Sequence, residues 1–148
     1  MDSFEMTVAA HGDLPALVLS VPTGDDLDRI TEICQDTDIQ EWTFVPRNYQ
    51  RSDAQFFVEQ VVAKGWSEGC ELTWAVREAD AGACPHLVGM LGITLSGPEG
   101  ARTGEVGYWL AAAARGRGTM TRAVAALIDM AFDPSGPLAL SALRWRCD

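Results

Sequence analysis

The amino-acid sequence predicts an α+β (mixed α/β) fold, in which a mixed central sheet carries helices on both faces. The 148 residues are 47% hydrophobic and 22% charged, which is typical of one globular domain. Short apolar runs rich in branched residues alternate with segments whose apolar residues recur at helical spacing. Turns containing glycine and proline separate these segments. The predicted order of elements is β-α-α-β-β-β-α-β.

The first half of the chain contains one predicted strand and two predicted helices. Residues 1–13 show no clear pattern and are interpreted as a loose leader. The apolar run 16–21 indicates a strand, and residues 27–34 repeat apolar side chains at helical spacing. Residues 36–51 mix charges, aromatics and a proline, which indicates a loop or a broken helix. Residues 52–65 indicate a second helix, with the serine at its start as N-cap.

Three strands follow, separated by two turns. The runs 72–77, 87–95 and 102–110 are apolar and rich in branched or aromatic residues. Residues 78–85 and 96–100 hold the Gly, Pro and Asp residues that favour turns. Because the connections are short, we expect an antiparallel meander.

A strand, a helix and a returning strand complete the predicted order. The helix extends to about residue 132, with an apolar face at helical spacing, and the segment 133–137 breaks it. Residues 140–146 form the last predicted strand. A strand that returns after a helix is expected to pair in parallel with the strand before that helix.

Composition excludes several classes of function. The net charge is −10, from 21 acidic and 11 basic residues, whereas nucleic-acid binding needs a basic surface. The four cysteines form no CxxC pair and the two histidines are isolated, so no metal site is expected. Cys147 is interpreted as a buried strand residue rather than as a nucleophile. With neither a signal peptide nor a membrane span of ~20 apolar residues visible, a cytoplasmic protein is expected.

The segment 104–126 is the most informative part of the sequence for function. A strand ends there, a glycine-rich turn follows, and a long helix begins. The first turn of a helix offers unpaired N–H groups to an anion, and glycines allow close approach. Arg115, Arg117 and Arg122 add positive charge, and no Asp or Glu occurs between Val106 and Ile128. These features predict an anion site, although an ordinary solvated turn has the same composition.

The residues of this segment resemble a known signature. RGRGTMT at 115–121 resembles the coenzyme A signature (Q/R)-x-x-G-x-(G/A) of the GNAT superfamily of N-acetyltransferases. EVGYWL at 105–110 is similar to the fourth strand of that family. The combination is most similar to the branch of ribosomal-protein N-terminal acetyltransferases (RimJ/RimL-like), as is IQEWTFVP at 39–46. The resemblance extends from about residue 17 to residue 147.

The resemblance implies a binding site for acetyl-CoA as co-substrate, without a metal. Backbone N–H groups of the turn would hold the pyrophosphate, and the last residues of the preceding strand would pair with the pantetheine arm. Met120 departs from the usual Gly or Ala. The residues to which the resemblance assigns these roles are Trp109, Leu110, Arg115, Gly116, Arg117, Gly118, Thr119, Met120 and Thr121.

An amine acceptor needs a group that removes its proton before attack. Glu105 is the candidate base, because strand alternation places it on the same face as Gly107 and Trp109. The alternative is an exposed strand carboxylate without a catalytic role. The aromatic side chains of Trp42, Phe44 and Tyr49 are candidates for lining the acceptor cleft, or alternatively for capping the core.

The family pattern continues beyond the last residue of this sequence. In the family, an Asn-containing helix and two closing strands follow the strand similar to 140–146. We therefore expect one GNAT domain over 1–148 that stops after its fifth strand, with its C-terminal strands missing. Apolar surface is expected to be exposed near Leu140, Leu143 and Trp145, and activity to be impaired.

Three functional hypotheses remain from the sequence. The first is an acetyl-CoA-dependent N-acetyltransferase acting on a primary amine, either a protein N-terminus or a small molecule. The second is an acyl-CoA-binding, catalytically impaired fragment or sensor. The third is another anion-binding domain such as a nucleotide binder, which the absence of a G-x-x-x-x-G-K-(S/T) motif disfavours. The expected partner is the amine acceptor, with neither nucleic acid nor membrane, and a homodimer is compatible with these features.

Overall fold

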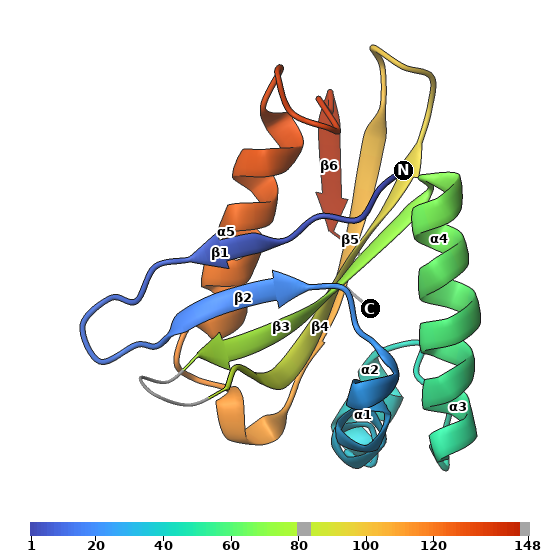
Figure 1. The fold of residues 1–148 in the computed structure, drawn as a ribbon, viewed down its shortest axis with the longest axis vertical. Helices are drawn as coiled ribbons and strands as arrows, with labels where there is room; N and C mark the ends of the chain where they lie inside the picture. Colours follow the sequence, from blue (N-terminus) through green and yellow to red (C-terminus); the bar gives the residue numbers. More distant parts are fainter. Residues whose placement is uncertain (80–83, 146–148) are drawn as a thin grey trace.

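The computed structural model describes residues 1–79 and 84–145, which form a six-stranded mixed sheet with helices on both faces (Figure 1). The strands follow one another in the sheet in chain order. Neighbours from β1 to β5 pair antiparallel, and β5 pairs with β6 in parallel. The predicted meander and crossover are therefore confirmed. The strands are β1 (Met6–Val8), β2 (Ala16–Ser20), β3 (Glu71–Ala79), β4 (His86–Ser96), β5 (Thr103–Leu110) and β6 (Ala142–Trp145).

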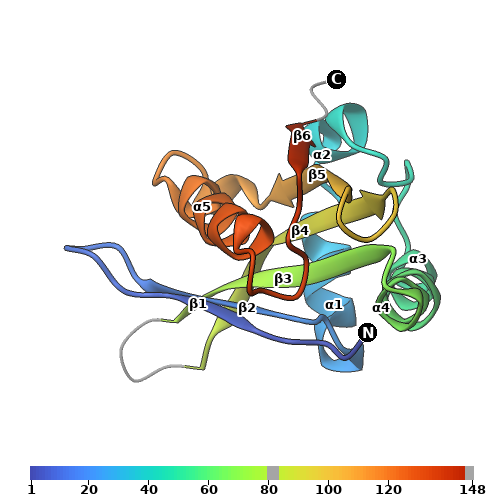
Figure 2. The same ribbon diagram turned by 90° about the horizontal axis from the view of Figure 1, so that it is seen from above.

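Two helical layers cover the sheet. On one face lies α5 (Thr119–Phe132), whose buried residues pack against the apolar side of the central strands. The other face carries α1 (Leu27–Ile33), α2 (Thr37–Trp42), α3 (Arg51–Phe56) and α4 (Ala63–Glu68), as Figure 2 shows from above. Helix α2 is the helical part of the segment predicted as a loop or broken helix. Each face of the sheet therefore has its own apolar core.

The N-terminal segment is ordered, which corrects the predicted loose leader. Strand β1 pairs with β2 and adds a sixth strand to the five expected. The Trp74 indole Nε1 donates to the carbonyl oxygen of Phe4 at 2.9 Å. The Phe4 ring also meets Trp66 and Trp74 edge to face, at centroid distances of 5.4 and 5.6 Å. Aromatic packing of this kind stabilises a segment whose sequence has no strand pattern.

The second predicted helix is longer than expected and changes its winding. It begins at Arg51, where Gln50 and Asp53 form a capping box, so the predicted N-cap at Ser52 is wrong by two residues. A π-helical segment, Phe57–Val62, separates α3 from α4. Such segments are frequent at functional sites. The helix ends at Gly69, which takes the left-handed conformation.

The C-terminal strand is shorter than predicted. It covers Ala142–Trp145, and residue 146 lies outside the described residues, as do residues 80–83 of the predicted turn 78–85. Residues 78 and 79 of that turn belong to β3 instead. Leu140 is buried beneath α5 with 6% exposure, so the prediction of an exposed Leu140 is wrong. Leu143 is half-buried, and Trp145 is 43% exposed, in agreement with the prediction for Trp145.

Two structural findings concern membranes and metals. No helix within residues 1–79 and 84–145 is both long enough and apolar enough to cross a bilayer. In the same described residues, no three His, Cys, Asp or Glu side chains gather closely enough to hold a metal ion.

Candidate acyl-CoA and acceptor site

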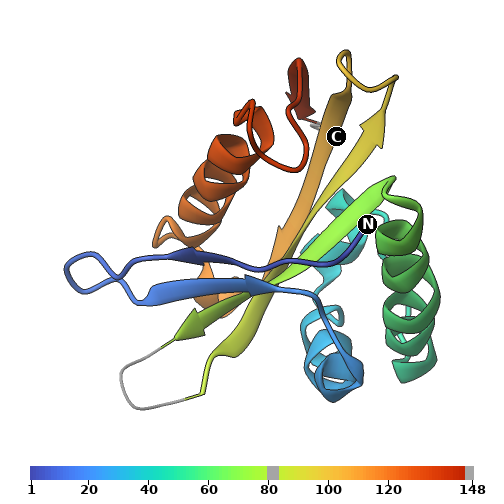
Figure 3. The same cartoon turned by 45° about the horizontal axis from the view of Figure 1, so that its top comes forward.

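The candidate site begins where β5 and β6 separate. Strand β6 pairs only with Thr103–Val106, the first half of β5. Within the described residues, the second half, 107–110, has no neighbouring strand on that side (Figure 3). A strand edge of this kind exposes N–H and C=O groups to a ligand that lies along it. The edge ends at the glycine-rich turn that leads into α5.

The turn leaves its backbone N–H groups without acceptors among the described residues. Gly116 and Gly118 adopt positive φ angles of 80° and 73°, which L side chains rarely adopt. Gly118 is the N-cap of α5, and no acidic residue lies in the first turn of the helix. Among the described residues, no acceptor is bonded to the amides of 116–121, while Arg122 N donates to Gly118 O. Six consecutive amides are thus available at the positive end of a helix dipole.

The arginine that opens the turn is held by acidic side chains from a distant segment. Arg115 Nη2 lies 3.1 Å from Asp36 Oδ2, and Arg115 Nη1 lies 3.8 Å from Asp38 Oδ2. Its Nε also donates to the carbonyl oxygen of Leu110 at 3.1 Å. The sequence lacks acids near the turn, but the fold brings two of them from the start of α2. The turn therefore has carboxylate neighbours that its own segment of the sequence lacks.

A further carboxylate, that of Glu78, contacts the turn from the sheet. Glu78 on β3 is 2% exposed, and its Oε1 accepts from Arg117 Nη2 at 3.0 Å and from Thr119 Oγ1 at 3.2 Å. The Arg117 side chain therefore points to the sheet and does not line the cavity in front of the turn. This arrangement corrects the prediction that the Arg117 charge faces the anion, and leaves its backbone N–H as the group that can.

The third arginine of the segment has a structural role. Arg122 donates to the carbonyl oxygens of Pro15 at 2.9 Å and Ala9 at 2.8 Å. These bonds join α5 to the turn between β1 and β2. The Arg122 guanidinium therefore stabilises the fold instead of adding charge to the turn.

A cavity of about 550 Å³ lies in front of the turn. Its polar end is formed by the turn, and its apolar wall includes Trp42, Trp109 and Met120. Met120 is buried with 7% exposure and packs beside Gly89, where a Cβ would come within 2.6 Å of the Trp109 carbonyl oxygen. Of the nine residues predicted to bind coenzyme A, all except Arg117 line this cavity: Trp109, Leu110, Arg115, Gly116, Gly118, Thr119, Met120 and Thr121.

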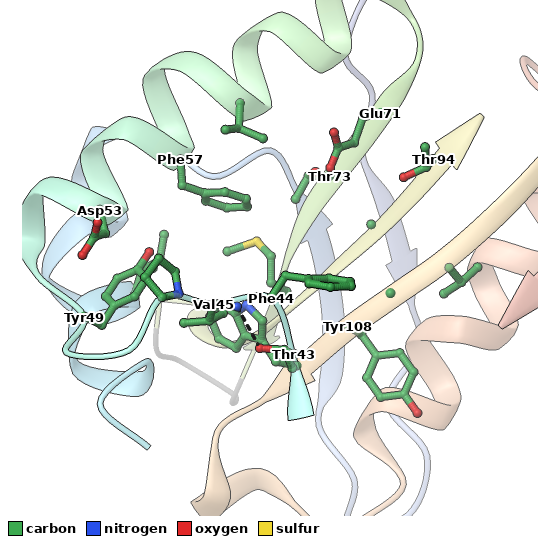
Figure 4. A pocket seen from close by; sticks show the side chains of 18 of the residues that line it. Thr43, Phe44, Val45, Tyr49, Asp53, Phe57, Glu71, Thr73, Thr94 and Tyr108 are labelled. Carbon is green, nitrogen blue, oxygen red and sulfur yellow. Dashed lines mark hydrogen bonds between the residues drawn. The ribbon is translucent and has the colours of Figure 1, made fainter. Parts of the chain in front are cut away.

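A second cavity of about 620 Å³, shown in Figure 4, adjoins the first and is lined by residues of β3, β4, β5 and the segment 42–61. The two cavities share Trp42, Thr43, Tyr108 and Trp109 in their linings, so they meet at the end of β5. Glu105 lines the second cavity together with Gly107 and Trp109, and so do Val106 and Tyr108 between them.

The three aromatic residues predicted for the acceptor cleft all line this second cavity, but in different ways. Trp42 is 61% exposed and Phe44 is 78% exposed, so both lie at the mouth. Tyr49 is 5% exposed, and burial, reinforced by the nearby Cys34 and Asp53, raises the pKa of its hydroxyl well above the usual value. Tyr49 therefore fulfils both interpretations, since it caps the core and forms part of the wall.

Sequence reasoning missed several residues of the site. Glu78 and Asp36 contact the turn from 39 and 79 residues away. Tyr108 is 47% exposed and borders both cavities. Glu71 and Thr73 line the second cavity. For Glu71, Thr73 and Glu78, the sequence signal was a polar residue within an otherwise apolar strand.

Known proteins support a specific family. The family model described as "Acetyltransferase (GNAT) domain" matches residues 16–148. No protein with curated annotation matches the sequence. Three solved acetyltransferases are similar in structure, and at 15–20% identity they support the fold alone.

The first is the microcin C7 self-immunity acetyltransferase MccE in complex with acetyl-CoA and AMP, at 20% identity and TM-score 0.66, over 86% of this chain and 67% of that one. The second is Mycobacterium smegmatis RimJ with CoA-disulfide, at 18% identity and TM-score 0.65, over 78% and 56%.

The third is the Salmonella typhimurium acetyltransferase that modifies the N-terminal serine of ribosomal protein L7/L12, at 15% identity and TM-score 0.63, over 76% and 62%. The chain thus spans between 56% and 67% of the length of these three structures. The family match covers nearly all of the sequence, and the sheet, turn and helix agree with it. The chain belongs to the GNAT family of acetyltransferase domains.

Proposed function

We propose that this chain binds acetyl-CoA and transfers the acetyl group to a primary amine. The observation that carries the proposal is the continuity of the two cavities at the end of β5. Of the turn 116–121, all residues except Arg117 line one cavity, and Glu105 lines the other. A ligand that lies along the open edge of β5 would reach from the anion site to the carboxylate.

The turn is the part of the site that would bind the diphosphate of coenzyme A. A diphosphate is bound by backbone N–H groups at a helix N-terminus, where no side chain has to be neutralised. The exposed Thr121 hydroxyl lies on the same side of the turn and can add a hydrogen bond. The end of β5 at Trp109 and Leu110 would lie along the pantetheine arm, which would pair with it in the manner of an added strand.

Glu105 is proposed as the general base. It would take a proton from the ammonium form of the acceptor, and the freed nitrogen lone pair would attack the thioester carbonyl carbon. The C–N bond forms, the C–S bond breaks, and coenzyme A leaves as the thiol or thiolate. A backbone N–H at the end of β5 would stabilise the oxyanion. The reaction passes through no covalent enzyme intermediate, and no cysteine within the described residues lines either cavity.

The lining of the second cavity favours a cationic acceptor. Its charged residues are Asp53, Glu71 and Glu105, and among the described residues no Lys, Arg or His lines it. A cavity whose charged lining residues are carboxylates attracts an ammonium ion. The structurally similar RimJ is in complex with CoA-disulfide, and the similar L7/L12 acetyltransferase modifies an N-terminal serine. Both are consistent with an amine acceptor here.

The proposal is tested by thiol release from acetyl-CoA over a panel of amines and short peptides. We expect turnover that Glu105→Gln reduces at least ~100-fold, because the amine then keeps its proton. Glu99→Gln, in the exposed turn between β4 and β5, is the matched control and should retain full turnover.

Binding separates the proposal from an acyl-CoA sensor. If calorimetry detects acetyl-CoA binding but no amine is acetylated, the sensor hypothesis replaces the enzyme. If ATP binds as tightly as acetyl-CoA, both are wrong and the turn belongs to a nucleotide binder.

A further inference from the structure

The floor of the second cavity is made of two rows of side chains that cross the sheet. Glu71, Thr94 and Glu105 are direct cross-strand neighbours on β3, β4 and β5. The adjacent row is Thr73, Gly92 and Gly107. Because both glycines lack side chains, the second row leaves open space between β3 and the end of β5. All six residues line the cavity.

Two polar side chains on β3 line this space. Thr73 is 4% exposed, and within residues 1–79 and 84–145 its carbonyl oxygen accepts from Trp66 Nε1, whereas its hydroxyl has no hydrogen-bond partner there. Glu71 is half-buried, and no Lys, Arg or His of the same residues forms an ion pair with its carboxylate. Figure 4 places these side chains next to each other, with Phe57 beside them. A buried hydroxyl and a carboxylate that have lost part of their hydration favour a ligand that donates hydrogen bonds.

The remaining lining residues determine which other groups such a ligand can have. Phe57, Val61 and Val45 give the cavity an apolar side, which suits a hydrocarbon body. Arg144 is the cross-strand neighbour of Glu105 on β6, but it does not line the cavity. Among the described residues, the charged side chains that line the cavity are therefore all acidic.

We propose that Glu71 and Thr73 form a subsite that binds a second cationic, N–H-bearing group of the acceptor. This inference rests on the proposed function, in which the reacting amine lies near Glu105. Glu71 lies two strands from Glu105, so their Cα atoms are roughly 10 Å apart. A flexible or apolar chain of several atoms is needed to join two cations over that distance. The protein is therefore expected to prefer acceptors with two ammonium groups over monoamines of the same length.

Direct binding tests the subsite without requiring turnover. Cadaverine and n-pentylamine have the same carbon chain and differ in the second amine. We expect calorimetry to show that the full-length chain binds cadaverine at least ~10-fold more tightly, which is the effect of one charge-assisted contact. Glu71→Gln and Thr73→Val should each reduce this preference, with Glu99→Gln as the charge-matched control.

A second pair of probes distinguishes a small diamine from a peptide. The dipeptides Ala-Lys and Ala-norleucine differ in the same way, and a preference confined to either pair identifies the source of the second cation. Thr73→Ser keeps the hydroxyl and should restore the preference that Thr73→Val loses. Thermal melting shows whether each variant folds. If Glu71→Gln does not fold, the effect of Thr73→Val on the cadaverine preference tests the subsite.

Three results would overturn the subsite. They are equal affinity for both members of each pair in the unaltered chain, a preference that survives both substitutions, and an equal loss of affinity for both probes in Glu71→Gln. These outcomes are independent of the proposed function. Acetylation of n-pentylamine without a preference for cadaverine leaves the enzyme standing and removes the subsite alone.

Discussion

Glu78 and Arg117 form a hydrogen-bonded ion pair that joins the middle of the sheet to the glycine-rich turn. Arg117 Nη2 lies 3.0 Å from Glu78 Oε1, and Thr119 donates to the same oxygen. The carboxylate is buried, whereas the Arg117 side chain is 44% exposed. The pair holds the turn from behind, so that its backbone N–H groups face the cavity in front.

Glu78→Gln is expected to weaken coenzyme A binding about tenfold and to lower the free energy of unfolding by about 1–2 kcal/mol. Glutamine keeps the size of the side chain but removes the charge that orients Arg117. Calorimetry and urea unfolding measure the two effects. Asp28→Asn breaks the exposed pair between Asp28 and Arg51 and should change stability by less than about 0.5 kcal/mol. Unchanged coenzyme A affinity in Glu78→Gln would show that the turn keeps its shape without the pair.

Gly118→Ala is expected to destabilise the chain by about 1 kcal/mol and to weaken coenzyme A binding. An added Cβ meets no atom within 4 Å, so the cost comes from the positive φ alone. Gly24→Ala is the control, because Gly24 also has open space but no positive φ. Denaturant unfolding and coenzyme A titration measure the outcome. If both variants behave alike, the backbone at residue 118 is not constrained.

Asp38→Asn is expected to tighten coenzyme A binding about two- to fivefold at low salt. Asp38 lines the cavity and lies 3.8 Å from Arg115, so it repels a diphosphate and competes for the guanidinium. The gain should disappear at high salt, where exposed charges are screened. Asp129→Asn, near the opposite end of α5, removes the same charge at a distance and should have no effect. Weaker binding in Asp38→Asn would mean that this carboxylate positions Arg115 usefully.

The stability of the chain is expected to fall as the pH rises above about 9. Burial raises the pKa of the Cys34 thiol from 9.0 to about 12. The unfolded thiol loses its proton at the lower pH and the folded thiol does not, so the native state binds more protons between these values. The free energy of unfolding then decreases by about 1 kcal/mol per pH unit, which urea unfolding at about pH 8 and about pH 10 would detect.

Cys34→Ala provides the comparison for this pH dependence. The variant removes the buried thiol, so its stability should decrease less steeply over the same range. Tyr49, whose pKa is also raised by burial, contributes to the remaining slope at higher pH. Identical slopes for the two proteins would show that Cys34 ionises freely in the folded chain.

The order of the elements could be predicted from the sequence, because it depends on local patterns. Branched apolar runs fixed four strands of the sheet to within two residues, and helical spacing predicted α5. The boundary errors at Ser52 and Leu140 have one local and one tertiary cause. A capping box formed two residues earlier, and Leu140 packs beneath α5 before β6 begins. Strand β1 was missed because its pairing depends on β2 and its aromatic contact on Trp74, and three residues have too little pattern.

The sequence by itself determined the glycine-rich turn, the face of β5 that carries Glu105, and the absence of acids close to the turn along the chain. Only the tertiary structure decided where the charges lie, because Asp36 and Glu78 reach the turn from other elements. It also placed Glu71 and Thr73 in the same cavity as Glu105, two strands away across the sheet. Local patterns report which face a side chain takes, whereas the register of distant strands decides which side chains meet.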